Sequence, residues 1–135
     1  MCSFGSSAIG GGSANKVGDN SWHATITGGA PNFIGTNSDY SAIGGGHQNT
    51  ITSNAWFATI PGGRGNVATN YDFAAGLGAK ANHEGAFVRA DSTGADFASS
   101  SNNQFSVRAG GGVRFVTGGA GARLALSLWA PAPPA

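Results

Sequence analysis

The stretch "SAIGGGHQNTITSNAWF", residues 41–57, occurs in recognisable form four times in the first half of the chain. Its isoleucine returns at intervals of 17 residues, and a leucine stands at the next step. Glycine pairs, an asparagine and a second aliphatic residue follow with the same spacing. The resulting columns are Ile9, Ile26, Ile43, Ile60 and Leu77; Val17, Ile34 and Ile51; and Asn15, Asn32, Asn49 and Asn66. Self-similarity at a fixed period indicates a repeat architecture.

The residue types of the repeat exclude helices and favour an all-β fold. Each glycine inside a helix costs about 1 kcal/mol relative to alanine, and every repeat holds two or three of them. The period instead predicts a parallel β-solenoid with coils of about 17 residues. In each coil S-A-I or A-T-I forms one short strand and N-x-I a second. Glycine and asparagine reach left-handed backbone conformations at least cost, so they form the turns.

Stacking of successive coils, about 4.8 Å apart, explains why the same residue types recur. Isoleucine over isoleucine contributes about 1.5–3 kcal/mol per buried side chain, and asparagine over asparagine forms a hydrogen-bonded ladder. Only two apolar positions per coil are evident, which is a thin core for a single chain. Association with further copies is a common remedy for a small core, so we expect a homotrimer, intertwined or side by side.

The repeat divides the chain into three parts. We place five coils in residues 6–91, a β-rich neck or cap in residues 92–119 and a flexible tail in residues 120–135. In residues 103–119 apolar and polar residues alternate around a glycine triplet, a pattern that predicts a hairpin or two strands joined by a wide turn. The final "APAPPA" is typical of a polyproline-like tail.

The fifth coil, "AAGLGAKANHEGAFVRAD" (residues 74–91), uses alanine where earlier coils use glycine. Residues 75–81 and 85–88 resemble the phrase S-V-A-I-G-x-x-A-x-A-x-G of the head repeats of trimeric autotransporter adhesins, and "SAIGGG" at 41–46 is a looser match. The resemblance implies a left-handed parallel β-roll, three chains side by side, and a head that binds host surfaces. The chain differs from that family in its 17-residue coils. Residues 103–119 are similar to the neck that follows β-helical repeats in phage tail-fibre-like proteins.

Two neighbouring positions of the repeat carry an aromatic series. The first position holds Trp22, Asp39, Trp56 and Asp72, and the second holds His23, Tyr40, Phe57 and Phe73. Adjacent residues of a strand face opposite ways, so we expect one series to point inward and the other outward. One interpretation is an aromatic ladder that packs along the stack or between subunits. The other is an exposed surface that stacks on sugar rings. Its candidate ligand-binding residues are Trp22, Asp39, Tyr40 and Trp56.

Composition narrows the function classes further. Charged residues make up 10% of the chain, against about 25% in typical soluble domains, and the net charge is +1. We therefore expect no nucleic-acid or anionic-membrane partner, and no apolar run approaches the roughly 18 residues of a membrane span. His23, His47 and His83 lack metal-ligand spacing, so neither a metal nor a cofactor is expected. The few acidic residues offer no convincing acid–base pair, and we expect no enzymatic activity.

The sequence favours a structural rod or head segment of a trimeric surface adhesin or tail-fibre-like protein. The expected partners are further copies of the chain and surface glycans or a host surface. The alternative is a free carbohydrate-binding or ice-binding module, although Thr25 and Thr59 alternate with Ala8 and Ala42 and so break a threonine ladder. The opening "MCSFGSSAIG" lacks the basic and apolar parts of a secretory signal. A place at the cell surface or in a virion is expected if the chain belongs to a longer protein.

Overall fold

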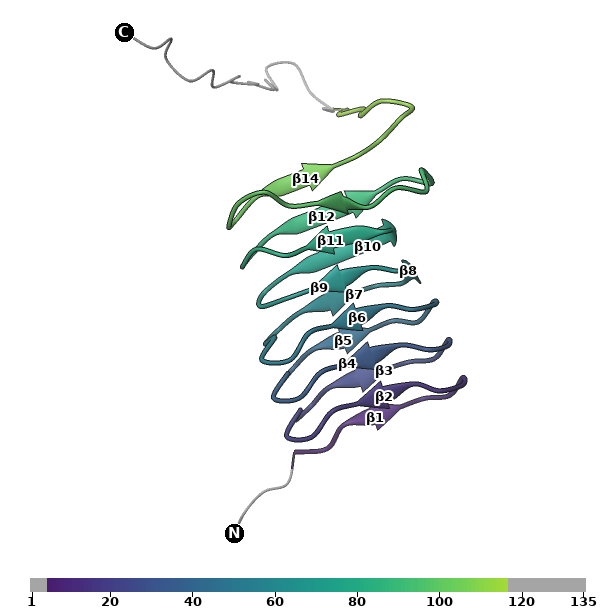
Figure 1. The fold of residues 1–135 in the computed structure, drawn as a ribbon, viewed down its shortest axis with the longest axis vertical. Coiled ribbons are helices and arrows are strands. Elements are labelled where there is room, and N and C mark those ends of the chain that lie inside the picture. Colours follow the sequence, from purple (N-terminus) through teal and green to yellow (C-terminus); the bar gives the residue numbers. More distant parts are fainter. Residues whose placement is uncertain (1–4, 117–135) are drawn as a thin grey trace, which may run out of the picture.

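The chain folds as a stack of coils in which every strand pairs in parallel with its neighbours. The computed structural model describes residues 5–116 and contains fourteen strands and no helix within that range. Figure 1 shows the coils stacked in chain order, with β1 near one end and β14 near the other. About six turns of an all-β parallel solenoid result, which confirms the fold class predicted from the repeat.

Most coils contribute one strand to each of two sheets. The first sheet contains β1 (Ala8–Ile9), β3 (Thr25–Ile26), β5 (Ala42–Ile43), β7 (Thr59–Ile60), β8 (Gly63–Arg64), β10 (Phe73–Leu77), β12 (Phe87–Ala90) and β14 (Phe105–Val107). The second sheet contains β2 (Lys16–Val17), β4 (Phe33–Ile34), β6 (Thr50–Ile51), β9 (Val67–Ala68), β11 (Ala79–Ala81) and β13 (Phe97–Ala98). The early strands are only two residues long, because glycine and asparagine turns follow each of them.

The pairing register of the early coils confirms the 17-residue period. Ile26 pairs with Ile43, and Ile43 pairs with Ile60. Backbone hydrogen bonds continue beyond the strands, for example from the amide of Gly44 to the carbonyl of Ile60 at 2.8 Å. The repeated turn asparagines adopt left-handed backbone angles, with φ of 55° at Asn37 and 59° at Asn54. Asparagine tolerates that conformation better than most side chains, which explains its fixed place in the repeat.

One glycine column is required by the close approach of neighbouring coils. Gly29 has a φ of +83°, and a Cβ built there would lie 2.1 Å from the carbonyl oxygen of Gly46. Gly46 stands in the same relation to Gly63. The preceding position is different, because a Cβ at Gly28 would meet no atom within 4 Å. Only one member of each glycine pair is therefore dictated by stacking.

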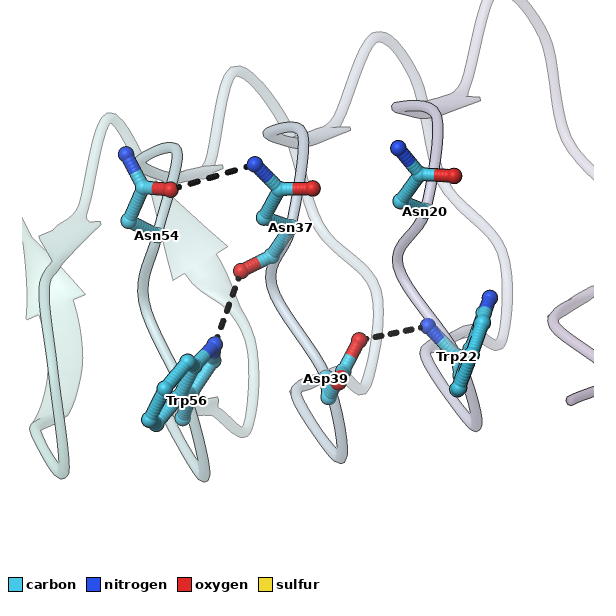
Figure 2. Close-up of a pocket in the computed structure, with 6 residues that line it drawn as sticks. All are labelled: Asn20, Trp22, Asn37, Asp39, Asn54 and Trp56. Atoms are coloured by element: carbon cyan, nitrogen blue, oxygen red, sulfur yellow. Dashed lines mark hydrogen bonds between the residues drawn. The ribbon is translucent and has the colours of Figure 1, made fainter.

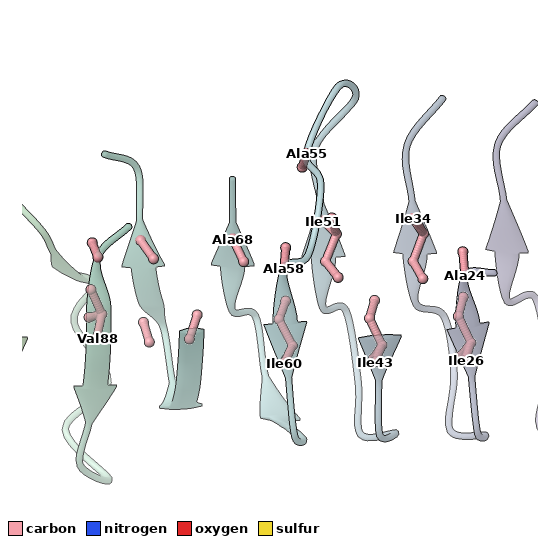
Figure 3. Packing of buried hydrophobic residues seen from close by; sticks show 14 of the residues in the cluster. Ala24, Ile26, Ile34, Ile43, Ile51, Ala55, Ala58, Ile60, Ala68 and Val88 are labelled. Carbon is pink, nitrogen blue, oxygen red and sulfur yellow. The ribbon is translucent and has the colours of Figure 1, made fainter. Parts of the chain in front are cut away.

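The core is filled by two aliphatic columns and by small residues between them (Figure 3). The predicted core residues Ile26, Ile34, Ile43, Ile51 and Ile60 are fully buried, as expected. Alanine and serine side chains complete each layer. They include Ala24, Ala55, Ala58, Ser38 and Ser41. In residues 5–116 no buried side-chain polar atom lacks a hydrogen-bond partner. The two predicted aliphatic columns are therefore present, and small residues rather than a third column fill the space between them.

Two predicted core residues lie at the open N-terminal end of the stack. Ile9 is 46% exposed and Val17 is half-buried, although both have the expected register with the next coil. Among the residues that the structure describes, each pairs with one further coil only, Ile9 with Ile26 and Val17 with Ile34. Burial in a solenoid depends on a coil above and a coil below, so the first coil of a column is always less buried than the second.

Leu77 was wrongly predicted to be the next isoleucine equivalent. Phe73 pairs with Thr59, so this coil is three residues shorter than the earlier ones. The next residue, Ala74, continues the isoleucine column and is fully buried, whereas Leu77 pairs with Arg64 and is half-buried. Counting by 17 passes over the shortened turn and selects a residue three positions too late.

The solenoid also extends beyond the predicted boundary at residue 91. β13 pairs in parallel with β11, and β14 pairs in parallel with β12. Within residues 103–116 neither the predicted hairpin nor the alternative of two strands joined by a wide turn is found, because β14 is the only strand there and forms another rung of the first sheet. Val113 and Phe115, the apolar residues that follow the glycine triplet, are exposed and outside any strand. The predicted tail at 120–135 lies outside the described residues.

Candidate functional site

The two aromatic series lie along one edge of the stack, in the turns that lead from the second sheet back to the first. Trp22 and Trp56 are 48% and 46% exposed, and Tyr40 and Phe57 are 55% and 51% exposed. The prediction that one series points inward was therefore wrong. Tyr40 and Phe57 have φ angles of 56° and 55°, so these residues do not follow the alternation of a strand.

The second series forms a column of stacked rings. His23, Tyr40, Phe57 and Tyr71 follow one another with centroid separations of 5.0, 5.0 and 5.6 Å and interplanar angles of at most 17°. Tyr71, not Phe73, continues this column, because of the shortened coil. Phe73 instead lies on the outward face of the first sheet and stacks on Phe87, which stacks on Phe105. That outward face has no continuous threonine row, since Thr25, Ala42, Thr59 and Phe73 follow one another.

The first series forms one wall of a groove of about 370 Å³. This tryptophan groove is lined by Asn20, Trp22, Asn37, Asp39, Asn54 and Trp56 (Figure 2). Three of the four predicted ligand-binding residues line it, namely Trp22, Asp39 and Trp56. The fourth, Tyr40, belongs to the neighbouring ring column and does not. The asparagines of the groove include the turn asparagines Asn37 and Asn54, and the sequence predicted asparagine only as a ladder and turn residue.

Large and small side chains alternate along the wall of the tryptophan groove. Asp39 Oδ1 accepts a hydrogen bond from the backbone amide of Trp22 at 2.8 Å. Asn70 Oδ1 accepts one from the amide of Trp56 at 2.9 Å, so Asn70 takes the place predicted for Asp72. The Trp56 indole reaches back one coil and donates from Nε1 to the carbonyl of Asn37 at 3.0 Å. An indole leaning over its neighbour needs more than the roughly 4.8 Å between coils, which favours a small residue on every second coil.

A row of amides faces this wall. Asn37 Nδ2 donates to Asn54 Oδ1 at 3.3 Å, which fixes the orientation of both side chains. The Asn20 amide and the second oxygen of Asp39 have no hydrogen-bond partner among residues 5–116. The tryptophan groove therefore offers two flat apolar rings together with donors and acceptors that are not consumed by the fold. This combination binds molecules with both apolar faces and polar edges.

The second hollow and the histidines are weaker candidates for a binding site than the tryptophan groove. A second hollow of about 340 Å³ includes Lys80 and Asp96, but the Lys80 ammonium already donates to the carbonyl of Gly65 at 2.6 Å. His83 Nδ1 is hydrogen-bonded to Ser99 Oγ at 2.8 Å. Within residues 5–116 no three histidine, cysteine, aspartate or glutamate side chains gather as a metal site, and no helix long and apolar enough to cross a membrane is present.

Comparison of the chain with known protein families, with curated proteins and with solved structures found no match.

Proposed function

We propose that the chain is a non-catalytic rod segment of a surface adhesin or tail-fibre-like protein, and that its tryptophan groove binds glycans. The observation that carries the proposal is the pair of half-exposed indoles on either side of Asp39. Indole faces pack on the apolar faces of sugar rings, while Asp39 and the facing asparagines supply acceptors and donors for hydroxyl groups.

The rigidity of the stack supports binding at such an open surface. The backbone amides of both tryptophans are held by side chains of the next coil, and the Trp56 ring is held by its own bond to Asn37. A ligand therefore does not have to order the Trp56 side chain. Immobilising a side chain on binding costs about 0.5–1.5 kcal/mol. A ring that is held in place before binding favours measurable affinity even in a shallow groove.

A glycan array tests this proposal, followed by titration of any glycan that binds. The double variant Trp22→Ala, Trp56→Ala should bind about 5- to 150-fold more weakly, since each stacked ring contributes about 0.5–1.5 kcal/mol. Tyr71→Ala is the matched control, because it removes an equally exposed ring at the end of the neighbouring column. Absence of binding to every glycan, or unchanged affinity of the double variant, would reject glycan binding at this groove.

The rod proposal includes assembly into a homotrimer. It is supported by the outward column of Phe73, Phe87 and Phe105, whose last ring is 67% exposed and available to a second copy. Light scattering should return about 40 kDa, three times the 13.3 kDa of the chain. Phe105→Ser should shift the mass towards that of a single chain, whereas Tyr71→Ala should not. A mass of 13.3 kDa for the unaltered protein would rule out the trimer.

A further inference from the structure

We propose that the tryptophan groove selects glycans carrying a positively charged amino group, which binds between the two indoles and against the Asp39 carboxylate. This inference rests on the proposed glycan binding and adds the chemical class of the ligand. It follows from three features of the groove: its uncompensated negative charge, the position of Asp39 between two aromatic rings, and the unpaired carboxylate oxygen.

No basic side chain of the groove lining neutralises the negative charge of Asp39. The residues that line the tryptophan groove include one aspartate and no lysine or arginine. Between residues 15 and 57 Lys16 is the only lysine or arginine. It lies in β2 of the second sheet, with its ammonium 5.9 Å from the centre of the Phe33 ring. Asp19 adds a second negative charge one residue before Asn20. A ligand that brings a positive charge is therefore favoured over a neutral ligand of the same shape.

The positions of the two indoles and of Asp39 define where the positive charge of the ligand would bind. Trp22 and Trp56 belong to the coils on either side of Asp39, so their backbones are about 9.6 Å apart, twice the strand spacing of about 4.8 Å. Cations are attracted to an indole face within about 6 Å of the ring centre, a range that reaches the space between the two rings. One oxygen of Asp39 is occupied by the Trp22 amide, and the other remains available to an ammonium donor.

Calorimetric titration with three tetrasaccharides of the same β-1,4 linkage tests the inference. The probes are the glucosamine tetramer, the N-acetylglucosamine tetramer and cellotetraose, at a pH where the glucosamine amino groups are protonated. The glucosamine tetramer should bind about ten-fold more tightly than the two neutral probes in low salt, a difference of about 1.4 kcal/mol. The difference should shrink in about 1 M salt, where screening acts over about 3 Å.

Asp39→Asn separates the site from the general charge of the edge. Asn70 already accepts the amide hydrogen bond of Trp56 in the equivalent place, so asparagine can accept that of Trp22 without loss of the fold. The variant should lose the preference for the glucosamine tetramer over the two neutral probes, whatever its effect on the affinity that all three probes share. Asp19→Asn is the matched control, because it removes the same charge from an exposed residue outside the groove lining. That control should keep most of the preference.

The outcomes distinguish the two proposals. Equal binding of all three tetrasaccharides leaves glycan binding intact and overturns the selection of amino groups. An equal effect of Asp39→Asn and Asp19→Asn also overturns it, since the preference would then reflect diffuse charge. If none of the three tetrasaccharides binds, the inference falls for these amino glycans, while the array decides whether the proposed function falls as well.

Discussion

The coils before Ile60 and those after Phe73 share the same two sheets but are stabilised by different chemistry. In the early coils neutral groups repeat at 17-residue intervals: glycine carbonyls, asparagine amides and serine hydroxyls. In the later coils the spacing within the first sheet changes from 14 residues between Phe73 and Phe87 to 18 between Phe87 and Phe105. Carboxylates and stacked phenylalanines take over there.

Asp72 shows how the later coils replace the repeated groups. In the early coils Ser41 Oγ accepts the amide of Ala58 at 3.1 Å. Asp72 occupies the equivalent place two coils on and accepts the amide of Ala86 at 2.8 Å, while its other oxygen accepts two hydrogen bonds from Thr69. A strict repeat is thus necessary only where identical side chains bond to one another. Elsewhere the backbone ladder continues as long as an acceptor of any kind is in place.

The largest expected effect concerns the spacing of the early coils. Gly29→Ala should destabilise the protein by more than about 4 kcal/mol, because its Cβ would lie 2.1 Å from the carbonyl oxygen of Gly46 at a left-handed φ. Gly28→Ala meets no atom within 4 Å and should change stability by no more than about 1 kcal/mol. Denaturant unfolding followed by circular dichroism measures both. Similar losses for the two variants would contradict the assignment of the required glycine.

Next in size is the asparagine ladder, which the sequence predicted and the structure confirms. Asn49 is fully buried, donates to the carbonyls of Gly45 and Gly63, and accepts from the amide of Asn66. Asn49→Ala should therefore cost about 3 kcal/mol in the free energy of unfolding, since several buried groups lose partners. Asn15→Ala, at the open end where water can replace the amide, should cost about 1 kcal/mol. Equal costs for the two variants would mean that the stabilising effect of a ladder asparagine does not depend on its burial.

How much the sequence could predict differs between the same two regions. The 17-residue period, the turn asparagines, the Asn15 to Asn66 ladder and the isoleucine columns follow directly from repeated letters. The shortened coil could not be located in this way, because Phe73 and Ala74 stand where the earlier coils have threonine or alanine and isoleucine, and no repeated letter marks the three-residue deletion. Leu77 and Asp72 were misassigned for that reason. The outward position of both aromatic series was missed because left-handed residues such as Tyr40 and Phe57 cancel the alternation of a strand.

In the region of the shortened coil, Asp72→Asn should cost about 1–2 kcal/mol, because an amide nitrogen cannot accept the bonds that one Asp72 oxygen receives from Thr69. Burial raises the pKa of Asp72 above 3.8, so its protonated form is favoured in the folded state. The stabilisation that comes from this raised pKa is therefore fully present below about pH 3.8. It is lost as the pH rises through the pKa of Asp72 in the folded state. The difference between variant and wild type should be larger at pH 3 than at pH 7. Thermal unfolding at the two pH values measures this, and a difference that grows with pH would contradict it.

The smallest and most local effect is expected at the last coil, where Asp91 accepts hydrogen bonds from the amides of Gly110 and Thr93 and from Arg108 Nε. These bonds, led by that of Gly110, hold the pKa of Asp91 far below its usual range, so its stabilising contribution is present above about pH 3.8 and is lost as the pH falls. The pH dependence of this contribution is therefore opposite in sign to that of Asp72. Asp91→Asn should speed hydrogen exchange at the amides of Thr93 and Gly110 at neutral pH and leave the amide of Gly44, deep in the early coils, unchanged. In a solenoid each coil contacts only its neighbours, so a perturbation at one end should remain there. Faster exchange at Gly44 as well would show that the two regions unfold as one cooperative unit, despite the different groups that stabilise them.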